Sequence, residues 1–83
     1  MTNKELAGVI LEQFGGADNI ASYENCMTRL RVKVYNEDLV QKTSIKKIEG
    51  VLGFVEDETY QVILGPGKVN KVTEEFGTRR LVM

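Results

Sequence analysis

The sequence lacks histidine altogether, and it has a single cysteine, Cys26, among its 83 residues. A lone cysteine cannot form a disulfide within the chain, so a reducing cytosol is the compartment that we expect. Without histidine, the common zinc ligand sets and a Cys-His nucleophile pair are excluded, and the sequence predicts neither a metal site nor a cofactor. If Cys26 takes part in chemistry, a group other than histidine must activate it.

Long apolar runs and an excess of one charge are also missing. No stretch approaches the roughly 18 apolar residues of a membrane-spanning helix, and Asn3, Lys4 and Glu5 near the start do not fit a signal peptide. The 11 Lys and Arg nearly balance the 12 Asp and Glu, for a formal net charge of −1. Domains that bind nucleic acid usually carry a clear basic excess, so we expect a soluble domain without a nucleic-acid partner.

What the sequence does contain is a regular order of helical and strand patterns, enough for one small domain. The predicted elements are, in chain order, a helix at 3–14, strands at 19–24 and 28–35, a helix at 38–48, strands at 51–56 and 60–64, and a helix that ends at Gly77. Thr2 and Glu5 form a capping box at the first helix, and Asn36 or Asp38 can cap the second.

The apolar residues indicate which faces of the helices are buried. The second helix has the weaker pattern, with apolar positions at Leu39, Val40, Thr43 and Ile48. The third helix has the i, i+3, i+4, i+7 stripe of a core-facing helix, carried by Val69, Val72, Thr73 and Phe76.

Each pair of strands is close enough in sequence to form an antiparallel hairpin. The first hairpin would turn over residues 24–27, with Asn25 as its turn residue, and the second would turn at Asp57 and Glu58. The order α-β-β-α-β-β-α then predicts an α+β fold, a four-stranded antiparallel sheet with three helices on one face. In the strand at 28–35, the alternation puts Leu30, Val32 and Val34 toward the helices and Arg29, Arg31 and Lys33 on the open face.

The segment from Asn25 to Arg31 carries the residues best suited to chemistry. Cys26 would lie at the end of a hairpin, where its side chain can reach solvent, and Arg29 and Arg31 lie about 6.5 to 7 Å apart along one strand face. Guanidinium groups favour the nucleophilic thiolate and match phosphate geometry with paired N–H donors. Thr28 adds a hydroxyl and a backbone N–H. These groups suit an exposed thiolate that holds a phosphoryl group.

The same residues also fit less specific interpretations. A lone cysteine in a small domain is most often a buried residue that fills space in the core. Cations at alternate positions are most often only the solvent-exposed face of a sheet. A redox-active thiol is a second alternative, although it would need a thiol from a partner because the chain has no second cysteine. A non-catalytic binding module with a basic open face is a third.

A longer pattern resembles a known family. Asn19 and Ile20, followed by Cys26, Met27 and the run from Thr28 to Val34, resemble the phosphocysteine signature of enzyme IIB domains of the glucose/sucrose type, from the bacterial phosphoenolpyruvate-dependent sugar phosphotransferase system. Asn36 departs from the signature, which normally has Asp or Gln there. The resemblance extends to residues 15–20 and 62–67, and it covers nearly the whole chain in the same order of elements.

The resemblance implies a specific role for each site residue. Cys26 would accept a phosphoryl group from a phosphohistidine of enzyme IIA and pass it to a sugar bound in the membrane domain, enzyme IIC. Arg29 and Arg31 match the arginines that support transfer to sugar, and Thr28 matches the signature threonine. The chain would then be a sugar phosphotransferase of the EC 2.7.1 class. Residues 1–83 would form one domain, the N-terminal part of a longer IIBC membrane protein on the cytoplasmic side of the membrane.

Overall fold

The predicted order of elements is confirmed by a computed structural model, which describes the backbone of residues 1–82 and the side chains of residues 1–78. Two short 3₁₀ turns, η1 and η2, are added to it. The elements are α1 (Asn3–Gln13), η1 (Ala17–Asn19), β1 (Ile20–Asn25), β2 (Arg29–Val34), η2 (Glu37–Leu39), α2 (Lys42–Lys47), β3 (Gly53–Glu56), β4 (Tyr60–Ile63) and α3 (Lys68–Val82).

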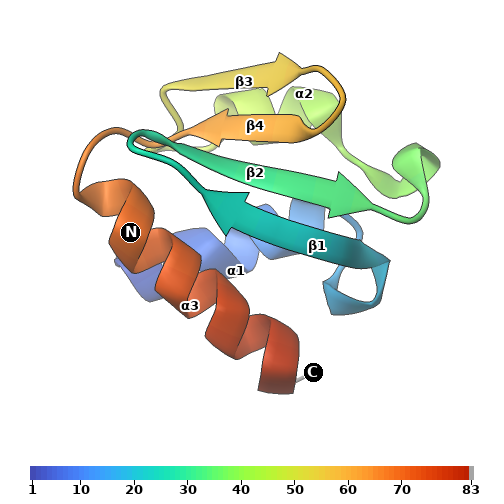
Figure 1. Cartoon of the computed structure of the whole chain (residues 1–83), viewed down its shortest axis with the longest axis horizontal. Coiled ribbons are helices and arrows are strands. Elements are labelled where there is room, and N and C mark those ends of the chain that lie inside the picture. The colour runs from blue at the N-terminus through green and yellow to red at the C-terminus, as the bar shows by residue number, and fades with distance from the viewer. Residues whose placement is uncertain (83) are drawn as a thin grey trace.

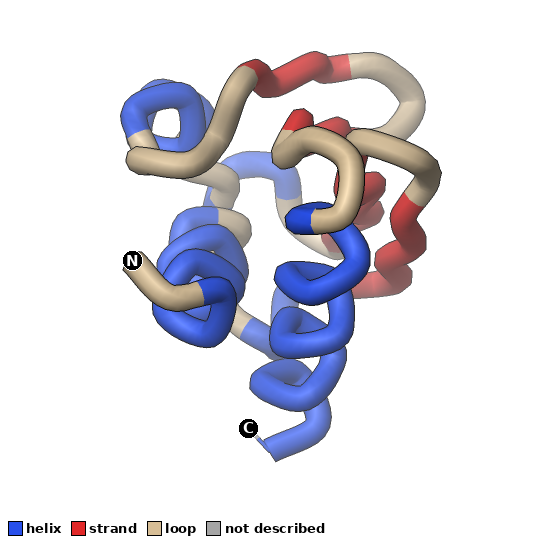
Figure 2. Tube along the Cα trace, turned by 90° about the vertical axis from the view of Figure 1, so that its left-hand side faces the viewer, coloured by secondary structure: helices blue, strands red, loops and turns tan. Residues whose placement is uncertain are grey.

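The four strands form one antiparallel sheet in the order β1-β2-β4-β3 (Figure 1). The three helices lie on one side of it, with α1 packed against both α3 and α2 (Figure 2). The α+β architecture expected from the sequence is therefore confirmed. Leu30 and Val32 face the helices and are fully buried, whereas the lysine and arginines of β2 lie on the open face.

The core fills the space between the sheet and the helices. Burying a Val, Leu, Ile or Phe side chain contributes about 1.5–3 kcal/mol, so this layer supplies most of the favourable free energy of folding. Its members come from every helix and from β1, β2 and β4, and they are Leu6, Ala7, Ile10, Leu11, Phe14, Ile20, Leu30, Val32, Val40, Ile45, Tyr60, Val62, Leu64, Val69, Val72 and Phe76.

The first helix forms as the sequence predicts. Thr2 Oγ1 accepts a hydrogen bond from the Glu5 backbone N–H at 3.1 Å, and Glu5 Oε1 accepts one from the Thr2 N–H at 2.9 Å, which completes the capping box. The helix ends at Gln13, one residue before the predicted end. Gly15 follows with φ +102°, a left-handed conformation in which a side chain would be strained.

The second predicted helix, at residues 38–48, is wrong in extent. Asn36 Oδ1 accepts from the Asp38 N–H at 2.9 Å, but this cap starts only the single turn η2. Val40 is extended and buried, and the Gln41 N–H donates to Gln13 O at 2.8 Å, which ties this segment to the end of α1. Helix α2 therefore begins only after the tie, over Lys42–Lys47.

The predicted apolar face of this helix was consequently misplaced. Leu39 and Thr43 are exposed, and Ile48 is only partly buried. The residue that anchors α2 in the core is Ile45, which is fully buried. Val40 is buried as expected, but from the extended link rather than from the helix.

Gly77 does not end the third helix as the sequence predicted, because α3 continues to Val82. Gly77 is buried, and a Cβ at this position would overlap the Tyr23 hydroxyl oxygen. The Tyr23 ring also packs on Phe76, with ring centroids 5.3 Å apart. The glycine is therefore explained by the space that Tyr23 fills, and not by a helix stop.

The second hairpin turns where the sequence predicts, since the Asp57 N–H donates to Thr59 O at 3.1 Å. Strand β3 is shorter than the predicted 51–56 and begins at Gly53, although the Leu52 N–H still donates to Ile63 O at 2.8 Å. Within residues 1–82, none of the helices is long and apolar enough to span a bilayer.

Candidate functional site

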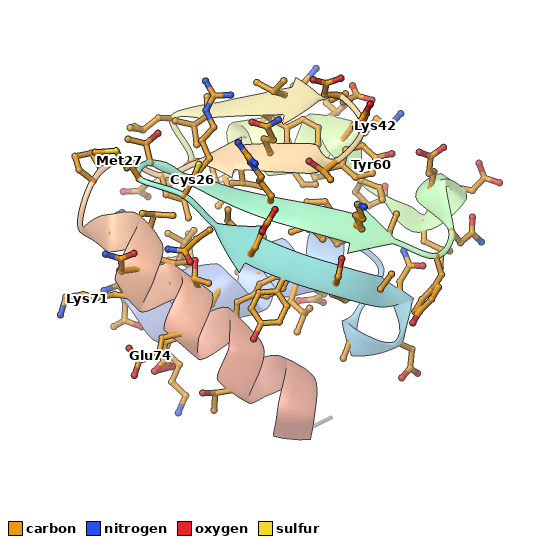
Figure 3. The ribbon with its side chains drawn as sticks, in the orientation of Figure 1. Cys26, Met27, Lys42, Tyr60, Lys71 and Glu74 are labelled. Atoms are coloured by element: carbon orange, nitrogen blue, oxygen red, sulfur yellow. The ribbon has the colours of Figure 1, made fainter. Side chains whose placement is uncertain are left out.

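The loop between β1 and β2 places Cys26 at one end of the sheet (Figure 3). Asn25 is not the turn residue that the sequence predicted, because it is the last residue of β1 and pairs with Leu30. The loop is Cys26-Met27-Thr28, and the Cys26 N–H closes it by donating to Arg29 O at 2.9 Å. Cys26 is a free, exposed thiol.

The strand register puts Cys26 and Arg29 on the same side of the sheet. Glu24 pairs with Arg31 and Asn25 with Leu30, so Cys26 and Arg29 are the next opposite positions. Side chains alternate between the two faces along a strand, and opposite residues share a face. Leu30 is buried under the helices, so Cys26 and Arg29 belong to the open face.

The segment between β4 and α3 holds the cysteine loop through backbone hydrogen bonds. The Thr28 carbonyl oxygen accepts from the Leu64 N–H at 2.8 Å and from the Gly65 N–H at 3.1 Å. Asn25 Nδ2 donates to Asn70 Oδ1 in the first turn of α3, at 2.7 Å. The N-terminal end of α3, the positive end of its dipole, therefore lies beside the cysteine loop (Figure 1).

The two arginines are arranged differently on the open face. Arg29 Nη1 donates to Gln61 Oε1 at 2.8 Å, so its guanidinium is tied to β4. Arg31 Nη1 lies 3.9 Å from Glu24 Oε1, a long and exposed ion pair that contributes little to stability. Arg31 Nε is buried without a hydrogen-bond partner and is out of reach of solvent. Each guanidinium has five N–H donors and Arg29 uses one on Gln61, while the Arg31 side chain is partly exposed, so both retain donors for an anion.

A hollow of about 370 Å³ lies on the open face beside the β3–β4 turn. Its lining is charged or polar, with both signs represented, and consists of Glu24, Arg31, Lys33, Asp57, Glu58, Thr59 and Gln61. Such a lining suits a polar, anionic group or a polar protein surface better than an apolar ligand. No group of three His, Cys, Asp or Glu side chains able to hold a metal ion occurs within the described part of the chain.

Two exposed apolar side chains lie in or beside the cysteine loop. Met27 is 87% exposed and Leu52 is 73% exposed. A Cβ built on Gly65 would meet Leu52 Cδ1 at 3.5 Å, and Gly65 is hydrogen-bonded to Thr28 O, so Leu52 lies next to the loop. A protein that reached the Cys26 sulfur would cover these side chains.

The structure brings together most of the residues singled out in the sequence. Cys26 and Thr28 share the loop, Arg29 lies opposite Cys26, and Arg31 lies one strand repeat further along the same face. Sequence reasoning missed Gln61 and Asn70. The polar Gln61 between Tyr60 and Val62 could have been assigned to the open face by alternation, whereas nothing in the sequence marks Asn70.

Comparison with known proteins gives three kinds of match. A family model described as phosphotransferase system, EIIB, matches residues 9–41. A putative phosphotransferase-system EIIBC component, YbbF of Bacillus subtilis, is 54% identical over 71 residues, which is 86% of this chain and 16% of that protein. A MurNAc-GlcNAc-specific EIIBC component of Staphylococcus haemolyticus is 47% identical over 74 residues, 89% of this chain and 16% of that protein.

A solved structure matches the fold as a whole. The crystal structure of one domain of a phosphotransferase-system IIabc component from Clostridium difficile superimposes with a TM-score of 0.85 and 35% identity. The match covers 92% of this chain and 80% of that one. The chain therefore spans 80% of one solved domain, but only 16% of the length of the two curated relatives.

Proposed function

Because the chain belongs to the EIIB family of the phosphotransferase system, we propose that it carries a phosphoryl group on Cys26 during sugar uptake. The group would come from a phosphohistidine of EIIA and go to a sugar bound in EIIC. The observation that carries the proposal is the exposed Cys26 thiol at the end of the sheet, on the same face as the Arg29 guanidinium.

The first transfer replaces a P–N bond with a P–S bond. The Cys26 thiol loses its proton to solvent, and the thiolate Sγ attacks the phosphorus of the phosphohistidine. The P–N bond breaks as the S–P bond forms, and its electron pair remains on the imidazole nitrogen. In the second transfer a sugar hydroxyl oxygen attacks phosphorus, the S–P electron pair returns to Sγ, and the hydroxyl proton passes to solvent.

This chain would stabilise the charge that moves between these atoms. Arg29 uses an Nη1–H bond on Gln61, and a guanidinium has five N–H donors, so further donors remain for phosphoryl oxygens. Arg31 lies further along the same face, with a partly exposed guanidinium held by a long ion pair to Glu24. The positive end of the α3 dipole beside the loop favours negative charge there. Fixed donors of this kind stabilise the transition state of phosphoryl transfer.

The partners follow from the same role. The relatives are EIIBC components, so we propose that EIIC is joined to this domain in one polypeptide and that this chain is its N-terminal part. The domain would then work at the cytoplasmic side of the membrane. The sugar pocket would lie in EIIC, and the name of one relative makes a MurNAc-GlcNAc disaccharide the first sugar to test.

The test is phosphorylation of the purified domain by phosphoenolpyruvate, the general phosphotransferase proteins and EIIA, followed by intact mass. We expect one added phosphoryl group on the natural protein and none on Cys26→Ser. A matched control is Cys26→Ser with Ser22→Cys, which moves the thiol along β1 on the open face to the position opposite Lys33. Full labelling of Cys26→Ser, or equal labelling of the control, would contradict the proposal.

A further inference from the structure

A side-chain bridge joins the end of β1 to the start of α3. Asn25, immediately before Cys26, donates from Nδ2 to Asn70 Oδ1 at 2.7 Å, across 45 residues of sequence. The other bonds that hold the loop, from the Cys26 N–H and to the Thr28 carbonyl, join main-chain atoms. The bridge can therefore be removed by substitution without changing the backbone groups that close the loop.

The bridge contributes little to folding. Both asparagines are exposed, and water competes for an amide–amide hydrogen bond at the surface. The bridge matters more for the position of Cys26 than for stability, because it fixes Asn25, the residue just before the cysteine. Asn25 lies on the helix side of β1 and Cys26 on the open face, so the bridge holds the backbone of Cys26 from the face opposite its side chain.

We propose that Asn25 and Asn70 are positioning residues for phosphoryl transfer at Cys26. This inference rests on the proposed function. The bridge holds the end of β1 against α3. The Cys26 sulfur is then aligned with the phosphorus of the docked donor and with the bond that breaks, and Arg29 lies beside it. Phosphoryl transfer depends on such alignment, and a displacement of about 1 Å can slow an enzyme-catalysed step by roughly a hundredfold.

The effect should appear in the transfer step and not in binding. In single-turnover transfer from phosphorylated EIIA, Asn25→Ala and Asn70→Ala should each lower the rate at saturating donor about five- to tenfold. The donor concentration that gives half the maximal rate should stay the same. Alkylation of Cys26 by iodoacetamide should also keep its rate, because a small reagent needs no docked geometry.

The double variant tests whether the two asparagines act as a unit. If they act only through their shared bond, the variant with both substitutions should be no slower than either single variant. Asn36→Ala is the matched control, since it removes an exposed side-chain bond at the opposite end of β2, to the Asp38 N–H. We expect this control to transfer at the natural rate. All four variants should remain folded at the assay temperature, which thermal unfolding followed by circular dichroism would show.

Several outcomes would overturn the inference. Natural transfer rates in Asn25→Ala, or losses that multiply in the double variant, would show that the bridge does not position the sulfur. Parallel losses of transfer and alkylation would assign the effect to thiol reactivity. In each case the natural protein would still be labelled on Cys26 and the proposed function would stand. Absence of label on the natural protein would instead overturn both.

Discussion

Replacing Gly77 with alanine should destabilise the protein, even though alanine is the better helix former. A glycine inside a helix costs about 1 kcal/mol relative to alanine, so helix propensity alone predicts a gain of that size. A Cβ at position 77, however, would overlap the Tyr23 hydroxyl oxygen and lie 3.2 Å from Tyr23 Cζ. The Tyr23 side chain or the helix backbone would have to shift, which disturbs the packing of the Tyr23 ring on Phe76.

The packing cost exceeds the propensity gain. Overfilling a packed site costs about 1–3 kcal/mol, which includes the loss of an aromatic pair worth about 0.5–1.5 kcal/mol. A central cost of about 2 kcal/mol, less the gain of about 1, leaves a net loss of about 1 kcal/mol. For a domain of this size, that loss lowers the midpoint of thermal unfolding by about 4–8 °C.

Urea unfolding followed by circular dichroism would measure this loss, and Tyr23→Phe would test its cause. Removing the hydroxyl removes the atom that the new methyl group would overlap. Gly77→Ala should therefore cost less in the Tyr23→Phe background than in the natural protein, and the difference is the coupling between the two positions. A stabilisation of about 1 kcal/mol by Gly77→Ala alone would refute the packing argument and leave helix propensity as the only effect.

Other predictions concern the site and the pH dependence of stability. Met27→Glu should raise the EIIA concentration needed for half-maximal transfer, because a charge would enter the exposed apolar surface that a docked partner covers, whereas Tyr35→Glu, at the far end of β2, should leave that concentration unchanged. Arg29→Lys keeps the charge but loses paired N–H donors, so it should slow sugar phosphorylation in EIIC vesicles roughly ten- to a hundredfold, and an unchanged rate would mean that charge alone suffices. Burial raises the pKa of Tyr60 above its ordinary 10.0, so the unfolded chain loses the phenolic proton first and the free energy of unfolding should fall as pH rises above 10. Tyr60→Phe should weaken that fall in urea titrations, and an equal fall in the variant would show that Tyr60 is not its source.

Local patterns were enough to predict most of the fold. The alternation along β2 depends only on neighbouring residues, and it assigned both faces of the sheet correctly. The capping box at Thr2 and Glu5 is also local, and it formed as expected. The errors arose where distant residues decide the outcome. The hydrogen bond from Gln41 to Gln13 moves the start of the second helix to Lys42, and the Tyr23 side chain leaves no room for a Cβ at position 77.

The site divides in the same way. The cysteine and the arginines belong to one hairpin, so their relative positions follow from strand geometry. Gln61 and Asn70 come from elements far along the chain, and their contacts with Arg29 and Asn25 depend on strand order and on where α3 begins. Alternation places Gln61 on the open face but does not name its partner, and nothing in the sequence marks Asn70, so both contacts could be found only in the folded structure.

The direction in which the Thr28 carbonyl points also matters for the phosphoryl group proposed for Cys26. A bare carbonyl oxygen next to a dianion would repel it, because the oxygen is the negative end of the peptide dipole. The Thr28 carbonyl in the cysteine loop is turned inward and its oxygen is shared by the amides of Leu64 and Gly65. Because these two hydrogen bonds hold the Thr28 carbonyl oxygen inside the fold, its negative charge repels an anion bound at Cys26 only weakly.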